Sequence, residues 1–181
     1  AYFVNIPITH KHKQKQKKEA GMMDFVVDKE NRRVKVVREF AAPLARVWAA
    51  WTQKELLDEW WAPRPWKTKT KSLELKNGGH WLYSMLGPEG EEHFCRIDYK
   101  SVVPMKSFKA LDSFCDSDGK VTNEIPVSDW NCEFSEAANK TTVMVEIKYQ
   151  ILADLEKYIE MGFKEGFTMA LGNLDELLTA A

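Results

Sequence analysis

The sequence predicts an α+β fold in which a curved antiparallel β-sheet wraps around a long C-terminal helix, with two short helices after the first strand. Residues 68–149 contain about six alternating apolar and polar segments with no helical pattern between them, which implies an antiparallel meander. Residues 154–178 then carry apolar and small side chains at steps of three and four, which form one stripe on a helix. The stripe and the apolar sheet face can bury each other.

Residues 1–22 are predicted to form an N-terminal extension, and residues 23–181 a single domain. The extension contains a run from His10 to Lys18 that is almost entirely Lys, His and Gln. Such a run cannot bury a core and its charges repel each other, so we expect it to be flexible. His10 and His12 could contact a metal ion, but without a third ligand a solvated tail is the better interpretation.

The first β-like segment, residues 24–40, has apolar residues on both sides of a polar turn at residues 28–31. It is interpreted either as a hairpin or as one interrupted strand. Pro43 suits the first turn of a helix that runs to about Thr52. Thr52, with Glu55 at the third position after it, can form a capping box for a second short helix.

Turn signals rich in Gly, Asn and Pro separate the later strands, most clearly Asn77-Gly78-Gly79. The predicted strands are Thr68–Leu75, His80–Met85, Phe94–Val103, Ser107–Cys115, Val127–Phe134 and Thr141–Tyr149. In the fourth of these, alternate residues share one face: Phe108, Ala110, Asp112 and Phe114.

Two Gly residues, Gly162 and Gly166, lie on the stripe of the predicted C-terminal helix. Each costs roughly 0.5–1 kcal/mol relative to Ala inside a helix. A physical reason to keep them is close approach, either of a neighbouring backbone in helix-on-sheet packing or of a bound molecule. Both interpretations stay open at this point.

Composition excludes several classes of function. The chain is 44% apolar and 29% charged, as in ordinary soluble proteins, and no apolar run approaches the ~20 residues of a membrane span. Residues 1–21 carry five Lys and one Glu, whereas the rest carries 21 basic and 26 acidic residues. The net negative charge of the chain after residue 21 argues against nucleic acid as a partner.

No phosphate-binding, dinucleotide or metal-ligand motif is present, so no cofactor and no metal are expected.

The three cysteines, Cys95, Cys115 and Cys132, form no C-x-x-C pair. An odd number of cysteines in strand-like apolar segments predicts buried, reduced thiols rather than a disulfide framework. Reduced thiols indicate a reducing compartment, so we expect the protein to be cytoplasmic.

Three groups of residues have a recognisable pattern and order. The first comprises Arg38-Glu39-Phe40-Ala41-Ala42-Pro43, Val47-Trp48-Ala49-Ala50-Trp51-Thr52 and Trp60-Trp61-Ala62-Pro63. The second comprises Gly78-Gly79-His80-Trp81-Leu82-Tyr83-Ser84-Met85 and Gly87-Pro88-Glu89-Gly90. The third is Gly166-Phe167 followed by Leu171, Leu174 and Leu177-Leu178.

Together these groups resemble the family of proteins homologous to the activator of the Hsp90 ATPase, over about Arg33 to Leu178. Ala62 stands where the family usually has Gly, and Phe167 where it usually has Trp. The resemblance implies the helix-grip fold of START lipid-transfer domains, Bet v 1 allergens and polyketide cyclases. It implies no fixed reaction, because that superfamily includes lipid binders, cyclases, hydrolases and co-chaperone domains.

A cavity between the C-terminal helix and the sheet is the predicted ligand site, because curvature leaves space there. Aromatic residues stack on flat ligands and bury large areas, although each can equally serve as core. The candidate ligand-binding residues are Trp60, Trp81, Tyr83, Met85, Phe108, Phe114 and Trp130, with Leu155, Tyr158, Gly162, Phe163 and Gly166 from the helix.

Glu165, on the flank of the stripe, is the one candidate catalytic residue. A carboxylate beside an apolar cavity could act as an acid, a base or an anchor, whereas on the solvent side it would do none of these. His93 and Cys95 point to one face of a strand, but no sequence pattern orients a base toward the thiol.

Three functions are consistent with the sequence. The first is binding of a hydrophobic small molecule, such as a lipid or an aromatic or polyketide-like compound. The second is interaction with an Hsp90-type chaperone, as the family resemblance implies, and the third is a cyclase or hydrolase reaction that uses a cavity acid. A homodimer through an exposed edge strand is also plausible for such a sheet.

Overall fold

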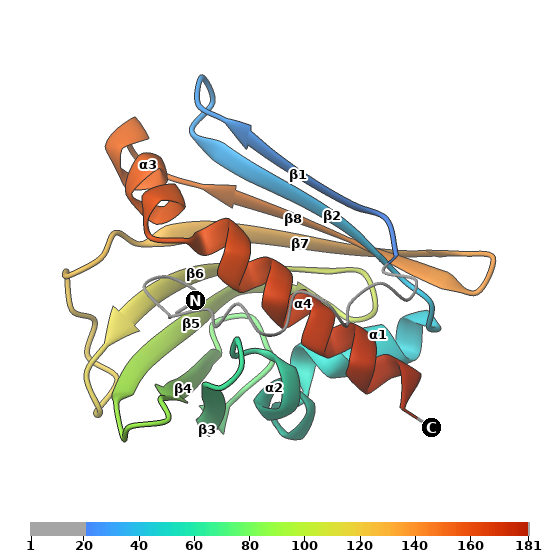
Figure 1. The fold of residues 1–181 in the computed structure, drawn as a ribbon, viewed down its shortest axis with the longest axis horizontal. Coiled ribbons are helices and arrows are strands. Elements are labelled where there is room, and N and C mark those ends of the chain that lie inside the picture. Colours follow the sequence, from blue (N-terminus) through green and yellow to red (C-terminus); the bar gives the residue numbers. More distant parts are fainter. Residues whose placement is uncertain (1–20, 181) are drawn as a thin grey trace.

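The computed structural model describes residues 21–180. The His10/His12 pair and all but the last two residues of the predicted extension lie outside the described residues. In the described part, one eight-stranded antiparallel sheet curves around a long helix, with a shorter helix at one end and two helices at the other (Figure 1). This architecture confirms the predicted α+β fold, in which the curved sheet wraps around a C-terminal helix.

The elements follow one another in a simple order: two strands, two helices, six strands and two further helices. The strands are β1 (Met23–Asp28), β2 (Arg33–Phe40), β3 (Lys67–Leu73), β4 (His80–Leu86), β5 (Glu92–Val103), β6 (Ser107–Cys115), β7 (Ser128–Ala137) and β8 (Lys140–Lys148). The helices are α1 (Leu44–Thr52), α2 (Lys54–Trp60), α3 (Leu152–Glu160) and α4 (Phe163–Thr179).

The sheet order is β1-β2-β8-β7-β6-β5-β4-β3. The six strands from β3 to β8 form the predicted meander, since each pairs with the next one along the chain. Residues 24–40 form a hairpin, and its second strand joins the meander at β8, with Val36 opposite Val145. The two short helices therefore follow the second strand, and the prediction that they follow the first was wrong because the polar turn at residues 28–31 ends a separate strand.

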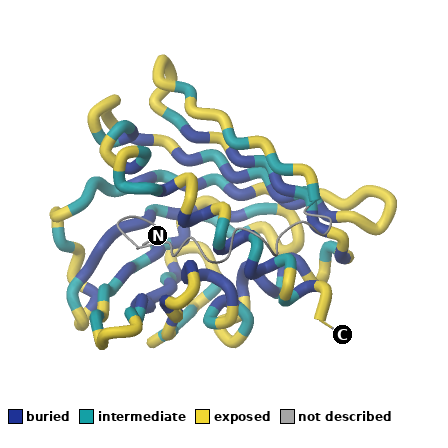
Figure 2. The backbone as a smooth tube through the Cα atoms, viewed as in Figure 1, coloured by how far each residue is buried: buried dark blue, intermediate teal, exposed yellow. Residues whose placement is uncertain are grey.

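The core lies between the concave face of the sheet and the helices. Alternate residues of β2, including Val34, Val36 and Phe40, have no exposed surface, and the same alternation runs along β8. Figure 2 shows these buried positions as bands across the inner sheet and along α4, while the hairpin turns are exposed and the outer strand β1 alternates between intermediate and exposed residues. The period of two in the sequence thus selects the face that packs against the helices.

The predicted capping box at Thr52 does not form. Helix α2 begins after Gln53, which makes no side-chain cap hydrogen bond, and the Thr52 hydroxyl donates to the carbonyl oxygen of Trp48 at 2.6 Å. Thr52 still belongs to the last turn of α1, where a hydroxyl can reach the carbonyl four residues earlier. The prediction was wrong because the two helices are separated by a single residue.

The C-terminal helix is broken, and the prediction of one continuous helix over residues 154–178 was wrong. Helix α3 ends at Glu160 and α4 begins at Phe163. Between them Gly162 adopts a left-handed conformation with φ of +90°, and a Cβ added there would meet only the Glu165 carboxylate, at 3.9 Å. Gly162 is therefore required by the backbone conformation of the break and not by close approach of another element.

A buried ion pair joins the hairpin to α4. The Arg38 guanidinium on β2 donates to the Asp175 carboxylate on α4, and it also lies 5.0 Å over the ring of Phe40. The Arg38 side chain is 5% exposed and that of Asp175 27% exposed. Burial raises the pKa of the Asp175 carboxyl, and the nearby Arg38 charge offsets only part of this effect.

Replacing Gly162 with Ala should lower the free energy of unfolding by about 1–2 kcal/mol, because an L-residue with a Cβ avoids the left-handed region. Urea denaturation measures this loss. Gly162→Asn is the matched control and should lose less, since Asn tolerates that conformation. Equal losses in both variants, or no loss with Ala, would contradict the role assigned to Gly162.

Asp175→Asn should lower the free energy of unfolding by about 2–3 kcal/mol, because it leaves the buried Arg38 charge without its carboxylate. Glu176→Gln is the matched control on the next residue, where the ion pair with Arg64 is 49% and 60% exposed, and it should lose less than about 1 kcal/mol. The double variant Arg38→Met with Asp175→Leu should recover most of the loss. If Asp175→Asn is as stable as Glu176→Gln, the buried pair between Arg38 and Asp175 contributes nothing to stability.

Candidate functional site

The candidate site is a small internal cavity between the sheet and the α1–α2 layer. Its volume is about 10 Å³, which is just enough for one water molecule. The residues that line it come from α1, the end of α2 and four neighbouring strands. They are Trp51, Trp61, Trp81, Ile97, Tyr99, Phe108, Ala110, Asp112 and Trp130.

Strand register brings these residues together. Across β5 and β6, Ile97 lies opposite Asp112, and Tyr99 opposite Ala110. Across β6 and β7, Ala110 in turn lies opposite Trp130. Because directly opposed residues point to the same side of a sheet, the alternating inward positions of three strands meet at one place. The sheet thus supplies a continuous wall for the cavity.

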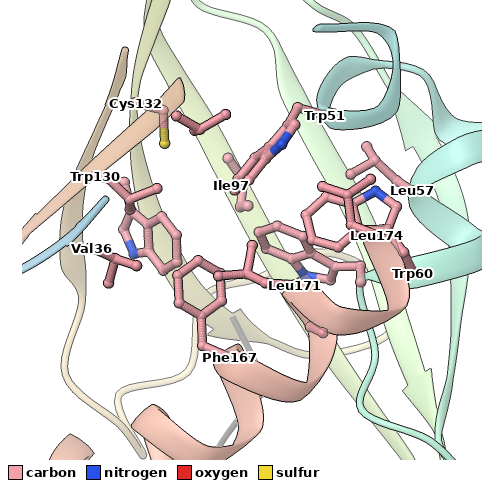
Figure 3. Packing of buried hydrophobic residues seen from close by; sticks show 14 of the residues in the cluster. Val36, Trp51, Leu57, Trp60, Ile97, Trp130, Cys132, Phe167, Leu171 and Leu174 are labelled. Atoms are coloured by element: carbon pink, nitrogen blue, oxygen red, sulfur yellow. The ribbon is translucent and has the colours of Figure 1, made fainter. Parts of the chain in front are cut away.

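Trp61 forms the other wall, and the indole rings around it are in contact. Its ring centroid lies 5.2 Å from that of Trp81, 6.0 Å from Trp51 and 6.2 Å from Trp130. The Trp61 indole nitrogen donates to the hydroxyl of Tyr83 at 3.0 Å. Figure 3 shows Trp51, Trp60 and Trp130 gathered around Ile97, with Phe167, Leu171 and Leu174 of α4 packed against them. The site is therefore an aromatic cluster with little free space.

Polar groups inside the cluster are few. The indole nitrogen of Trp130 donates to the Ser128 hydroxyl and that of Trp81 to the Thr70 hydroxyl, both at 3.0 Å. The indole nitrogen of Trp51 is buried and has no hydrogen-bond partner among the described residues. A ligand with an acceptor group could satisfy this donor.

The sequence-based selection missed six of the nine lining residues, and Asp112 is the charged one among them; the other five are Trp51, Trp61, Ile97, Tyr99 and Ala110. Asp112 is 2% exposed and lies in a lining that is otherwise aromatic or aliphatic. The signal was present, because strand alternation places Asp112 on the same face as Phe108, Ala110 and Phe114. A charged residue at an inward strand position is rarely buried without a role, so this position could have been selected from sequence.

The structure brings some predicted site residues together and separates others. Trp81, Phe108 and Trp130 line the cavity. Tyr83 lies next to it, stacked on Trp81 with ring centroids 4.1 Å apart. The remaining candidates are outside the lining, and all except the half-buried Gly162 are buried in the core: Trp60, Met85, Phe114, Leu155, Tyr158, Phe163 and Gly166.

The residues of α3 pack at the other end of the sheet, and Phe163 at the start of α4 lies between that end and the cavity, with its ring 6.3 Å from that of Trp130. The ring of Phe163 lies 6.2 Å from that of Phe25 on β1, and Tyr158 lies 5.2 Å from Tyr149. The break at Gly162 turns α3 away from the line of α4, so one continuous stripe could not place these side chains correctly. Glu165 is exposed on α4 and does not line the cavity.

The thiols of Cys115 and Cys132 are poor nucleophiles in this setting. All three cysteines are buried, and none forms a disulfide with another described residue. Burial raises the pKa of the Cys115 thiol to about 11 and that of Cys132 further, so both stay protonated at neutral pH. The ring of His93 stacks on Trp66 with centroids 5.6 Å apart. Among residues 21–180, no group of three or more His, Cys, Asp or Glu side chains could hold a metal ion.

Two larger hollows lie on the surface near the start of β7. Their volumes are about 230 and 310 Å³, and both include Val127 and Gln150. Charged residues such as Asp129, Lys148 and Lys157 contribute to their walls. Water competes well with ligands at such open, polar surfaces, so the enclosed aromatic cavity is the stronger candidate site.

Of the helices in the described residues, none has the length and apolar character needed to cross a membrane.

Comparison with solved structures identifies close structural relatives. The crystal structure of protein Ms6760 from Mycobacterium smegmatis shares 29% identity and a TM-score of 0.80, over 88% of this chain and 99% of that chain. The solution structure of a protein from Arthrobacter aurescens shares 26% identity and a TM-score of 0.81, over 86% and 91% of the two chains.

A further relative is similar in fold at lower identity. This crystal structure, of an AHSA1 protein from Silicibacter pomeroyi, shares 20% identity and a TM-score of 0.65, over 81% of this chain and 96% of that chain. Comparison with curated proteins gave no match. The family model described as "Activator of Hsp90 ATPase homolog 1-like protein" matches residues 41–179. The chain therefore belongs to the family of proteins that are like homologue 1 of the activator of the Hsp90 ATPase.

Proposed function

We propose that this protein binds a small hydrophobic molecule in the cavity lined by Trp51, Trp61, Trp81 and Trp130. The observation that carries this proposal is the concentration of aromatic side chains around one internal space, together with a single buried carboxyl group. Ligand pockets are typically apolar and aromatic with a few polar groups that orient the ligand.

Binding requires the cavity to open, because about 10 Å³ is far below the ≈ 300 Å³ of an ordinary ligand pocket. The strands β4 to β7 are hydrogen-bonded on both sides and resist displacement. The walls that can move are Trp51 on α1 and Trp61 after α2, because these side chains come from short helices at the edge of the domain. A ligand would enter by displacing these two rings.

The test is a titration with the neutral apolar probes toluene and N-phenylnaphthylamine, followed by the indole N–H signals in NMR spectra. The signals of Trp51, Trp61, Trp81 and Trp130 should shift on binding. Ala110→Leu fills the cavity and should weaken binding by about tenfold or more, at a cost of about 1–3 kcal/mol in stability. Lys109→Leu, an exposed position on the same strand, is the matched control and should bind like the wild type.

Two outcomes would contradict the proposal. If neither probe shifts the cavity indole signals of the folded wild type, the cavity does not open for apolar ligands. If Ala110→Leu remains folded and binds as well as Lys109→Leu, the probe occupies another place on the protein.

The small volume of the cavity favours a second candidate function, interaction with an Hsp90-type chaperone. A domain whose core is nearly filled can present its surface to a protein partner without holding a ligand. Purified chaperone would then be retained on the immobilised protein, and its ATPase rate would change when the protein is added. If the chaperone is not retained and its ATPase rate is unchanged, the chaperone-interaction function is ruled out.

A further inference from the structure

The indole N–H of Trp51 is a hydrogen-bond donor that the fold leaves unused. Trp51 is 3% exposed, and its indole nitrogen has no hydrogen-bond partner among the described residues. A donor that has lost its water on burial and found no acceptor destabilises the folded state. Because such groups are rare in folded proteins, this one calls for an explanation.

Other tryptophans of the core have their donors satisfied. The indole nitrogen of Trp60 donates to a backbone carbonyl oxygen at 2.8 Å. The indole nitrogens of Trp61, Trp81 and Trp130 each donate to a hydroxyl group at 3.0 Å. The fold supplies acceptors for these four indoles and none for Trp51, so an unused donor is not a general feature of this core.

A Phe side chain at position 51 would avoid the unsatisfied donor. The Trp51 ring contacts those of Trp60, Trp61 and Phe134 edge to face, with centroids 4.9, 6.0 and 5.9 Å away. A Phe ring can make contacts of the same kind without burying an N–H group. A neighbouring ring face is only a weak acceptor for the indole N–H. An oxygen atom that arrives with a bound molecule would satisfy this donor fully.

We propose that the ligand of this cavity carries a neutral acceptor oxygen, as in a ketone or an ester, which accepts a hydrogen bond from the indole N–H of Trp51. This inference rests on the proposed function and specifies the chemical class of its ligand. Trp51 and Ile97 both belong to the lining (Figure 3). The cavity has room for one water-sized group, which is about the size of a carbonyl oxygen.

The charge of the ligand follows from the lining, which includes no Lys, Arg or His among the described residues. An anionic acceptor such as a carboxylate would lose its hydration in this cavity without meeting an opposite charge. A neutral oxygen needs only the single donor that Trp51 offers. The ligand is therefore a neutral compound and not a fatty acid or another carboxylate.

The unused donor also lowers the cost of opening the cavity. Of the two rings that would move, Trp61 has to break its hydrogen bond to the hydroxyl of Tyr83. Trp51 has no such bond to break, so its ring is the easier one to displace. Its N–H then gains an acceptor from the ligand, which stabilises the liganded state and not the closed one. A ligand with an acceptor oxygen should thus be preferred over a hydrocarbon of the same shape.

The test compares acetophenone with α-methylstyrene, which has the same shape but a methylene group in place of the carbonyl oxygen. In NMR titrations of the wild type, acetophenone should move the indole N–H proton of Trp51 further downfield than α-methylstyrene does, because a hydrogen bond to oxygen deshields the proton. Both ligands carry the same ring, so its ring-current effect is common to the two. Benzoate should bind about tenfold or more weakly than acetophenone, because it is an anion.

Trp51→Phe removes the donor and keeps an aromatic ring. The ratio of the dissociation constant of α-methylstyrene to that of acetophenone should fall about tenfold in this variant, since only acetophenone loses a hydrogen bond. Trp48→Phe, the same substitution at a buried residue of the same helix outside the lining, is the matched control and should keep the ratio of the wild type. The NMR comparison in the wild type applies even if Trp51→Phe does not fold.

Three results would overturn the inference. Equal downfield shifts of the Trp51 N–H proton with acetophenone and α-methylstyrene would show that this group does not donate to the ligand oxygen. An unchanged ratio of dissociation constants in folded Trp51→Phe would show that the donor does not select the ligand. Benzoate that binds as tightly as acetophenone would show that the ligand need not be neutral. The proposed hydrophobic site survives each of these results, and its own failure is recognised by the absence of indole shifts with toluene.

Discussion

The antiparallel pairing of β2 with β8 is the interaction on which the rest of this structure depends. It joins the N-terminal hairpin to the last strand of the meander, across more than a hundred residues of sequence. Without it, the sheet would be a six-stranded meander, and α4 would lose the surface that carries Arg38. With it, the concave face is wide enough to cover α4, and the Arg38–Asp175 pair joins the helix to the hairpin.

Helix α4 and the α1–α2 layer then cover different parts of the same concave face. The Asn173 amide of α4 donates to the carbonyl oxygen of Ala62 at 2.9 Å, so the two layers are joined at the residue that follows Trp61 in the chain. The aromatic cluster is held between this junction and the sheet. Tight packing on all sides explains why the cavity is so small, and why a ligand must move side chains from the helical layer.

Much of the fold could be predicted from local patterns. Period-two alternation identified the meander strands closely, for example β8, predicted at residues 141–149 and observed at Lys140–Lys148. The break at Gly162 was missed because apolar residues at steps of three and four continue across it. A left-handed residue changes the direction of a helix without changing the spacing of its side chains. The site was predicted less well, because only Trp81, Phe108 and Trp130 of the nine lining residues were selected, and the charged Asp112 was among the six overlooked.

Residue spacing alone was sufficient for the six strands of the meander, the two short helices and the family, because alternation, turn residues and motif order are local properties of the chain. It could not indicate which aromatic side chains share a cavity. That choice depends on strand register, such as Ile97 opposite Asp112, and on the position of Trp61 above the sheet. Which aromatic side chains line the cavity is determined by packing in three dimensions, because residues far apart in sequence must fill the same space without overlap.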